Sequence, residues 1–245
     1  MIRKGIDGAE IAFIINKGLL QEPGTYYYSV NIYKLQKINQ CYIEDIFKEP
    51  NNEYKFDKNK IGSQLQVNPS TVKNLFDEIS IRLNNERNRR SEGVVAFHNM
   101  FVLHSILLLN LATGYRAVCE PFESVNIFDF NANTIFISDK EERTELAARV
   151  LVVPELAMEQ LTKYLAHLNI LSIYYRNTHP IISNQILLSK DGDSAELPLF
   201  FFIFDNEIVP VTPTTLAGYL DPVFPLKLNW HRHFMRTKLR ELGFS

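Results

Sequence analysis

Apolar residues recur with helical spacing in three long parts of the chain. The most apolar helix begins after Gly93 and continues to about residue 112, and its many apolar positions predict that it lies at the centre of a domain. A second helix is predicted from Pro154 to about Tyr175, with proline at a favoured first-turn position. A third runs from about Asn229 to Leu242 and is followed by Gly243, which suits the position after a helix end.

Between the first two helices the pattern changes to short apolar runs that indicate strands. Residues 134–137 and 148–153 are predicted strands, preceded by a short apolar run at 126–130 and a turn at 131–133. A charged connection, residues 138–147, joins the two strands. Further on, residues 186–189 and 197–204 fit either strands or a buried irregular segment, and a short helix begins at Thr212–Pro213. The predicted fold class is mainly α with a small antiparallel β-sheet, an α+β protein.

The composition of the chain changes near residue 92. Residues 1–92 are polar and rich in Asn, Lys, Glu and Tyr, and we interpret them as an N-terminal helical part that binds DNA. The tract Asn84–Ser91 is the predicted linker, because none of its side chains suits a core. Residues 93–245 are predicted to form a second domain around the apolar helix.

Composition and charge exclude several classes of protein. The 245 residues are 46% hydrophobic and 22% charged, which excludes a disordered or collagen-like chain. The net charge of −2 excludes a uniformly basic coat but allows a local basic face. Cys41 and Cys119 are too few for a disulfide framework or a cysteine-rich zinc site, so we expect a cytoplasmic protein without metal or cofactor. The most apolar stretch, residues 101–112, is shorter than the ~20 residues of a membrane-spanning helix, which predicts no membrane partner.

Two basic motifs stand on either side of the predicted strands. The first is Thr113-Gly114-Tyr115-Arg116 at the end of the apolar helix, and the second lies in the last helix, from Arg232 to Gly243. In this order and spacing they resemble the tyrosine recombinase (phage integrase) family, over residues 93–245. That family has a Thr-Gly-x-Arg box, a lysine in a β-hairpin turn, and a later His-x-x-Arg-His helix that ends in glycine.

The resemblance implies a role for individual residues. Arg116 matches the first catalytic arginine, Lys140 the hairpin lysine, and Arg232 with His233 the second arginine and the histidine that follows it. In such an enzyme a tyrosine attacks a DNA phosphodiester. The forked donors of the arginines hold phosphate oxygens, and the lysine protonates the leaving oxygen. The implied partner is double-stranded DNA, and the implied role is integration or recombination of a mobile element.

The sequence departs from the family pattern at three places. Cys119 stands where an acidic residue is common, and Asn229 stands where the His-x-x-Arg motif begins with histidine. The family's nucleophilic tyrosine follows the second arginine, whereas here Tyr219 is the last tyrosine and precedes Arg232. Because no covalent intermediate forms without that nucleophile, we expect the chain, which ends at Ser245, to hold a phosphate without cutting the strand. Enzymatic activity therefore stays open, and the catalytic domain is expected to lack its C-terminal end.

Three further features bear on function without the family. In the last helix Arg232, Arg236 and Arg240 follow at i, i+4 and i+8 and form one basic stripe, which suits phosphate contacts. Residues 60–75 resemble a helix-turn-helix in which Lys73 and Asn74 would face the DNA groove, although a two-helix packing unit gives the same pattern. The histidines of the apolar helix, His98 and His104, are interpreted as core or boundary residues.

Three classes of function follow from these observations. The leading hypothesis is a tyrosine-recombinase-like DNA-binding protein with an incomplete catalytic domain. The alternative is a non-catalytic DNA-binding or regulatory protein that uses residues 60–75. The third is an interaction module without a nucleic-acid role. Since the family's final helices cover the core, their absence also predicts exposed apolar surface near the last helix, with self-association or a second recombinase chain as partner.

Overall fold

The computed structural model describes most of the chain after residue 66 and short parts before it. Contacts divide the chain into two units, which we call unit 1 (Met1–Asn68 with Asn229–Ser245) and unit 2 (Pro69–Leu228). The division falls before Pro69, whereas composition alone suggested a boundary near residue 92. The described residues are 29–31, 33–35, 37–38, 60–62, 65, 67–89, 93–115, 121–138, 148–194, 197–225 and 229–243.

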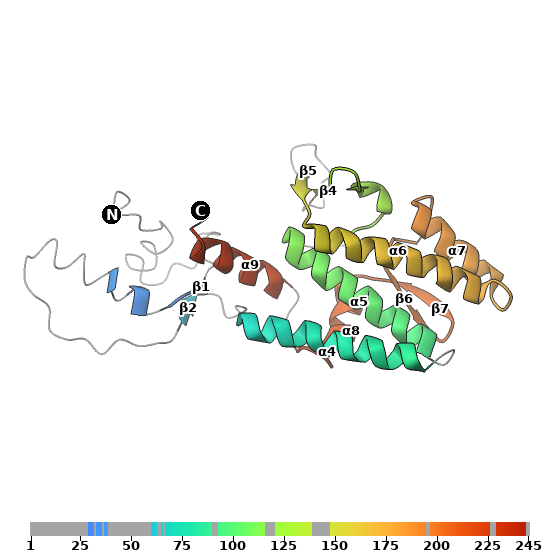
Figure 1. Cartoon of the computed structure of the whole chain (residues 1–245), viewed down its shortest axis with the longest axis horizontal. Helices are drawn as coiled ribbons and strands as arrows, with labels where there is room; N and C mark the ends of the chain where they lie inside the picture. The colour runs from blue at the N-terminus through green and yellow to red at the C-terminus, as the bar shows by residue number, and fades with distance from the viewer. Residues whose placement is uncertain are drawn as a thin grey trace, which may run out of the picture. The chain divides into compact units, whose positions relative to one another are not determined.

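Helices make up most of unit 2, with two small antiparallel sheets among them (Figure 1). This arrangement confirms the predicted α+β fold class. Unit 1 contains, in its described residues, the short strands β1 (Ser29–Asn31) and β2 (Lys60–Gly62) and the helix α9 (Trp230–Glu241). The elements of unit 2 are α4 (Pro69–Asn88), α5 (Val94–Thr113), the 3-10 turn η3 (Val125–Ile127), β3 (Phe128–Asp129), β4 (Thr134–Ser138), β5 (Ala148–Val152), α6 (Glu155–Tyr175), α7 (Pro180–Asp191), β6 (Phe201–Phe204), β7 (Glu207–Pro210) and α8 (Pro213–Leu220).

Helix α5 is the centre of unit 2, as its apolar composition predicts. It contacts α4, α6, α8 and β6, and 11 of its 20 residues are buried. The helix has 20 residues, more than the apolar stretch from 101 to 112 suggested. Among the described residues it is the one helix long and apolar enough to cross a membrane, a test that a buried core helix also passes, and more than half of it is buried.

Side chains from α5 and α6 satisfy the backbone along one edge of β6. The Asn99 side chain donates to the Ile203 carbonyl and accepts from the Ile203 N–H, each at 2.8 Å. His98 Nε2 lies 3.0 Å from the Phe201 carbonyl. The Tyr164 hydroxyl donates to the Leu199 carbonyl at 3.0 Å. Because unpaired buried backbone groups are costly, these three side chains allow a two-stranded hairpin, β6–β7, to pack inside a helical unit.

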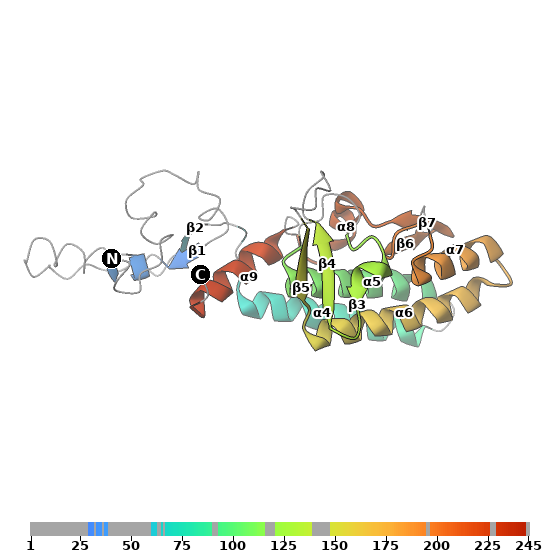
Figure 2. The ribbon, with the colours of Figure 1, turned by 90° about the horizontal axis from the view of Figure 1, so that it is seen from above.

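The second sheet of unit 2 has the strand order β3-β4-β5 and is entirely antiparallel (Figure 2). Strands β4 and β5 confirm the predicted strands, and their pairing runs from Thr134 opposite Val152 to Ser138 opposite Ala148. The inward side chains of Ile135 and Ile137 are buried. The pleat of the strand therefore puts Ile135 and Ile137 on the core face of β4 and leaves Phe136 on the opposite, exposed face.

Helix α4 corrects two predictions. Residues 60–62 form strand β2, paired with β1, where the helix-turn-helix pattern required the first helix. The predicted linker is also wrong in part, because α4 continues to Asn88. Val72, Leu75 and Ile79 give α4 one buried stripe against α5. The polar end of α4 remains helical because its solvent side holds i,i+4 and i,i+3 ion pairs, Glu78–Arg82 and Glu86–Arg89.

A single glycine allows α4 and α5 to approach each other closely. A Cβ atom built on Gly93, the residue before α5, would lie 2.2 Å from the Glu86 carbonyl oxygen of α4. That distance is far below van der Waals contact, and a backbone oxygen cannot swing away as a side chain can. The apolar helix therefore starts at the one residue type that fits this approach.

Residues 180–191 form a helix, α7, although residues 186–189 were interpreted as a strand or an irregular segment. Pro180 lies in the first turn of α7, and Gly192 ends it with a φ of +80° in the left-handed region. Helix α6 begins directly after Pro154, and α8 begins after Thr212 with a capping box formed by Thr212 and Thr215. The predictions for α6 and α8 are thus confirmed.

Candidate nucleic-acid interface

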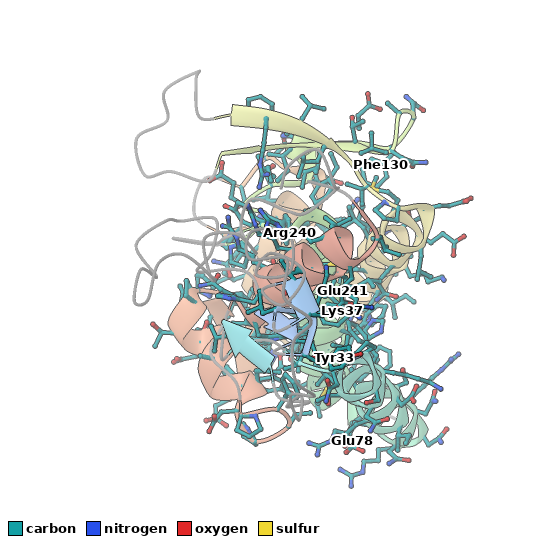
Figure 3. All side chains as sticks on the ribbon, turned by 90° about the vertical axis from the view of Figure 1, so that its left-hand side faces the viewer. Tyr33, Lys37, Glu78, Phe130, Arg240 and Glu241 are labelled. Carbon is teal, nitrogen blue, oxygen red and sulfur yellow. The ribbon has the colours of Figure 1, made fainter. Side chains whose placement is uncertain are left out.

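Helix α9 carries the basic stripe in its described residues. Asn229, where the family motif begins with histidine, precedes the helix with a φ of +75°, a left-handed conformation that asparagine tolerates well. Arg236 is exposed, and Arg232 and Arg240 are half-buried. Figure 3 labels Arg240 and Glu241 at the C-terminal end of the helix. The arginine spacing and the helical geometry together place three guanidinium groups along one side of α9.

The side of α9 that does not carry the arginine stripe is buried. Trp230, His231 and Thr237 are buried, and His233 is only 2% exposed. Burial lowers the pKa of His233 below its ordinary value, and the neighbouring charge of Arg232 lowers it further. The imidazole is therefore neutral at pH 7, so His233 acts as a neutral donor or acceptor there, while the arginines supply the positive charge of the helix.

The Thr-Gly pair of the first motif has a local structural role. The Thr113 hydroxyl donates to the Leu109 carbonyl at 2.8 Å and accepts from the Tyr115 N–H at 3.2 Å. Gly114 takes a φ of +62°, and its N–H bonds to the Asn110 carbonyl at 2.9 Å. Thr113 and Gly114 thus end α5, and they direct the chain toward Arg116. Arg116 itself, like Cys119, lies outside the described residues.

Strands β4 and β5 form the hairpin on either side of Lys140. The pair Ser138–Ala148 is the last one before the connection, residues 139–147, which contains this lysine. Lys140 also lies outside the described residues, so no contact of its side chain is assigned. What the structure establishes is that a lysine follows an antiparallel strand and that a second strand returns beside the first.

The candidate catalytic residues of the described chain are divided between the two units. Arg232 and His233 belong to unit 1, while strands β4 and β5 and the end of α5 belong to unit 2. Among the described residues there is also no group of three or more His, Cys, Asp or Glu side chains that could hold a metal ion.

Lys73 and Asn74 lie on the exposed side of α4, opposite the stripe that packs on α5. They are accessible to a partner, but the helix that would precede them in a helix-turn-helix is replaced by strand β2. Glu78, on the same helix, forms an ion pair with Arg82 and is visible in Figure 3. The exposed side of α4 therefore lacks the two-helix frame that orients a recognition helix in DNA.

A contact between a buried and a half-buried histidine was not predicted from the sequence. His98 is fully buried, as interpreted from the sequence, but its partner His167 on α6 was not foreseen, because the two are 69 residues apart. His98 Nδ1 lies 3.2 Å from His167 Nε2, and the other ring nitrogen of His98 faces the Phe201 carbonyl. Since a carbonyl only accepts, Nε2 of His98 carries the hydrogen, and His167 donates to Nδ1.

The charge state of this pair makes it a structural element. Burial lowers the pKa of His98 well below its ordinary value, helped by the nearby His167, and burial lowers the pKa of His167 to about 4. Both rings are neutral at pH 7, and their hydrogen bonds are used within the fold. The pair therefore stabilises the contact between α5, α6 and β6 and offers no charge to a phosphate.

No protein-family model, no curated protein and no solved structure matches the chain.

Proposed function

We propose that the chain binds double-stranded DNA as a tyrosine-recombinase-like protein and acts in the integration or recombination of a mobile element. The observation that carries this proposal is the order of elements around the two motifs. A helix ends in Thr113-Gly114, the antiparallel strands β4 and β5 precede and follow the connection that contains Lys140, and a later helix carries Arg232 and is followed by Gly243 in the left-handed region. This order supports the proposal, because the resemblance expects its motifs at a helix end, between two antiparallel strands and in a later helix.

The distribution of charge supports DNA as the partner. The sequence of unit 1 contains 13 Lys and Arg against 9 Asp and Glu, whereas that of unit 2 contains 13 against 19. The net charge of −2 is thus the sum of a basic unit 1 and an acidic unit 2. Because α9 belongs to the basic unit, phosphate contacts are expected there, and their affinity should fall steeply with salt.

The decisive experiment measures DNA affinity as a function of salt. We expect Arg236→Ala to weaken binding to duplex DNA and to lower the slope of log K against log [salt] by about 1, since one phosphate contact is lost. Arg176→Ala is the matched control, because Arg176 is an exposed arginine of unit 2 and should leave the slope unchanged. Equal effects of the two substitutions, or no binding at low salt, would contradict the proposal and favour an interaction module.

A second assay addresses cleavage. No tyrosine follows Arg232 in the sequence, so we propose that this polypeptide holds DNA without forming a covalent intermediate. Incubation with nicked duplex DNA, followed by denaturing electrophoresis, should show no protein–DNA band. A covalent band would establish that the chain is itself a nuclease or recombinase with a nucleophile other than the expected tyrosine.

The alternative, a regulator that reads DNA through residues 60–75, makes the opposite prediction. Its binding would depend on Lys73 and Asn74 and would not depend on Arg232. Because β2 occupies the position of the first helix, we expect Lys73→Ala with Asn74→Ala to change affinity by less than about twofold. A loss of binding in this double variant, with Arg232→Ala unaffected, would favour the alternative.

A further inference from the structure

Strand β5 is an edge strand among the described residues, because it pairs with β4 on one side and with no described strand on the other. Figure 2 shows it at the margin of its sheet. Edge strands that are flat and apolar pair readily with another chain, and proteins usually protect them with proline, charged side chains or a covering element. The five residues of β5, Ala148–Val152, contain no proline and one charged residue, the exposed Arg149.

The hydrogen-bond pattern identifies the backbone groups on the outer edge. Val153 N–H donates to the Asn133 carbonyl at 2.8 Å, in the same register as the β4–β5 pairs. Hydrogen-bonded pairs alternate along an antiparallel ladder, so Leu151 and Arg149 also bond toward β4. The N–H and C=O groups of the remaining three residues, Ala148, Val150 and Val152, therefore point away from β4.

The side chains next to this edge are unusually apolar for a surface. Val150 is 65% exposed and Val152 is 77% exposed. Phe136, directly opposite Val150 on β4, is 54% exposed. Residues opposite each other share one face of a sheet, so Phe136 and Val150 form an exposed apolar row that ends at the outer edge.

We propose that β5 pairs antiparallel with β5 of a second copy of this chain, about a twofold axis that passes between the two Val150 residues. This register opposes Val150 to Val150 and Ala148 to Val152, so every outward donor of one copy meets an outward acceptor of the other. The apolar row becomes continuous across the axis, from Phe136 and Val150 of one copy to Val150 and Phe136 of the second.

The same register explains why the partner is a second copy. A twofold axis through the middle residue makes the strand complementary to itself, which is the requirement for an isologous dimer. Arg149, the charged residue of the strand, faces Leu151 of the second copy and not another arginine. The pairing thus brings no like charges into direct opposition, which would otherwise destabilise it.

A charge-swap experiment tests the register directly. Val150→Lys alone and Val150→Glu alone place like charges opposite each other across the axis, and each is expected to weaken self-association about tenfold or more. An equimolar mixture of the two variants is expected to recover a dimer, because lysine then faces glutamate. Analytical ultracentrifugation over a concentration series measures the dissociation constant in each case.

The control variant is Ile170→Lys, which changes an equally exposed isoleucine of α6, 67% exposed and away from the sheet edge. It should self-associate like the unchanged chain. A monomer at every concentration of the unchanged chain, or dimers that survive Val150→Lys, would overturn the proposal.

Amide hydrogen exchange on the unchanged chain gives a second test that needs no substitution. The Val150 and Val152 amides should become protected as the protein concentration rises, whereas the amides of Leu151 and Arg149 should be protected at all concentrations. Concentration-independent exchange at Val150 would also overturn the proposal. Because neither test involves DNA, its outcome is independent of the proposed function.

Discussion

Two sheet edges in unit 2 differ in how their backbone groups are satisfied. The edge of β6 is buried, and Asn99, His98 and Tyr164 satisfy its backbone groups. The outer edge of β5 meets no such side chain among the described residues, and its Val150 and Val152 are exposed. The comparison teaches that this chain caps a strand edge with side chains where water cannot reach it, and leaves an edge uncapped where water or a second copy can supply the partner.

Acid should produce the largest change, in part through His167, which contacts His98 at the capped edge. Burial and the charge of Lys163 lower the pKa of His104 to about 4, and burial lowers the pKa of His167 to about 4, whereas an unfolded histidine has a pKa of about 6.5. Below about pH 6.5 the unfolded chain therefore binds protons that the folded chain does not bind. The unfolding free energy falls as the pH decreases from about 6.5 to about 4. Each histidine contributes about 3 kcal/mol to this loss.

Urea unfolding at a series of pH values measures this effect, and His167→Gln isolates one part of it. Glutamine keeps an N–H donor for His98 but does not titrate, so between about pH 6.5 and pH 4 the variant should lose about 3 kcal/mol less than the unchanged chain. A variant with the unchanged pH dependence would contradict the assignment of the loss to buried neutral histidines.

Asn99→Leu should have the next largest effect on the unfolding free energy. Leucine has a similar size but removes both hydrogen bonds to Ile203, which leaves a buried N–H and a buried carbonyl unsatisfied. We expect a loss of about 4 kcal/mol in the unfolding free energy. Asn184→Leu on the exposed side of α7 is the control and should change it by less than about 0.5 kcal/mol. Similar losses in both variants would mean that Asn99 does not cap the strand edge.

Tyr164→Phe removes a single bond from the same edge. The phenyl ring can occupy the same buried position, but the Leu199 carbonyl loses its hydroxyl donor. The expected loss is about 1.5 kcal/mol, measured by the shift of the urea midpoint at constant slope. An unchanged unfolding free energy would contradict the contribution assigned to this hydrogen bond.

Val150→Thr at the uncapped edge should have the smallest effect on the folding of a single copy. The substitution keeps a β-branched side chain on an exposed strand position, so the unfolding free energy at low protein concentration should change by less than about 0.5 kcal/mol. A large loss there would show that β5 is covered within its own chain, and the contrast between the two edges would disappear.

The sequence predicts elements well where the local pattern decides them. The strands around residues 134–137 and 148–152 are short apolar runs with β-branched residues, and α6, α8 and α9 each have a proline or glycine signal at one end. Helix α7 was missed, because the short apolar run at 186–189 fits a strand or a helix equally and only its contact with α6 settles the choice. The helical end of α4 was missed because polar residues on a solvent side resemble a linker.

For the candidate site, the sequence supplies the residues but not their assembly. The order Arg116, Lys140, Arg232 and the resemblance to recombinases are read from the chain alone and remain predictions. The arginine stripe of α9 also follows from spacing alone, since side chains three or four residues apart share a helix face. Neutral His233 could not be inferred in this way, because its pKa depends on burial by residues distant in sequence.

The sequence by itself determined the helices α5, α6, α8 and α9, the strands β4 and β5, the net charge and the position of each basic residue along the chain. Only the tertiary structure decided which polar groups form hydrogen bonds within the fold. Asn99 bonds to Ile203, 104 residues away in the sequence, and His98 bonds to His167, 69 residues away. The tertiary structure also decided which strand edge stays uncapped, since that depends on which elements pack beside the strand. Periodicity describes one element at a time, whereas the satisfaction of backbone groups is a property of their neighbours in space.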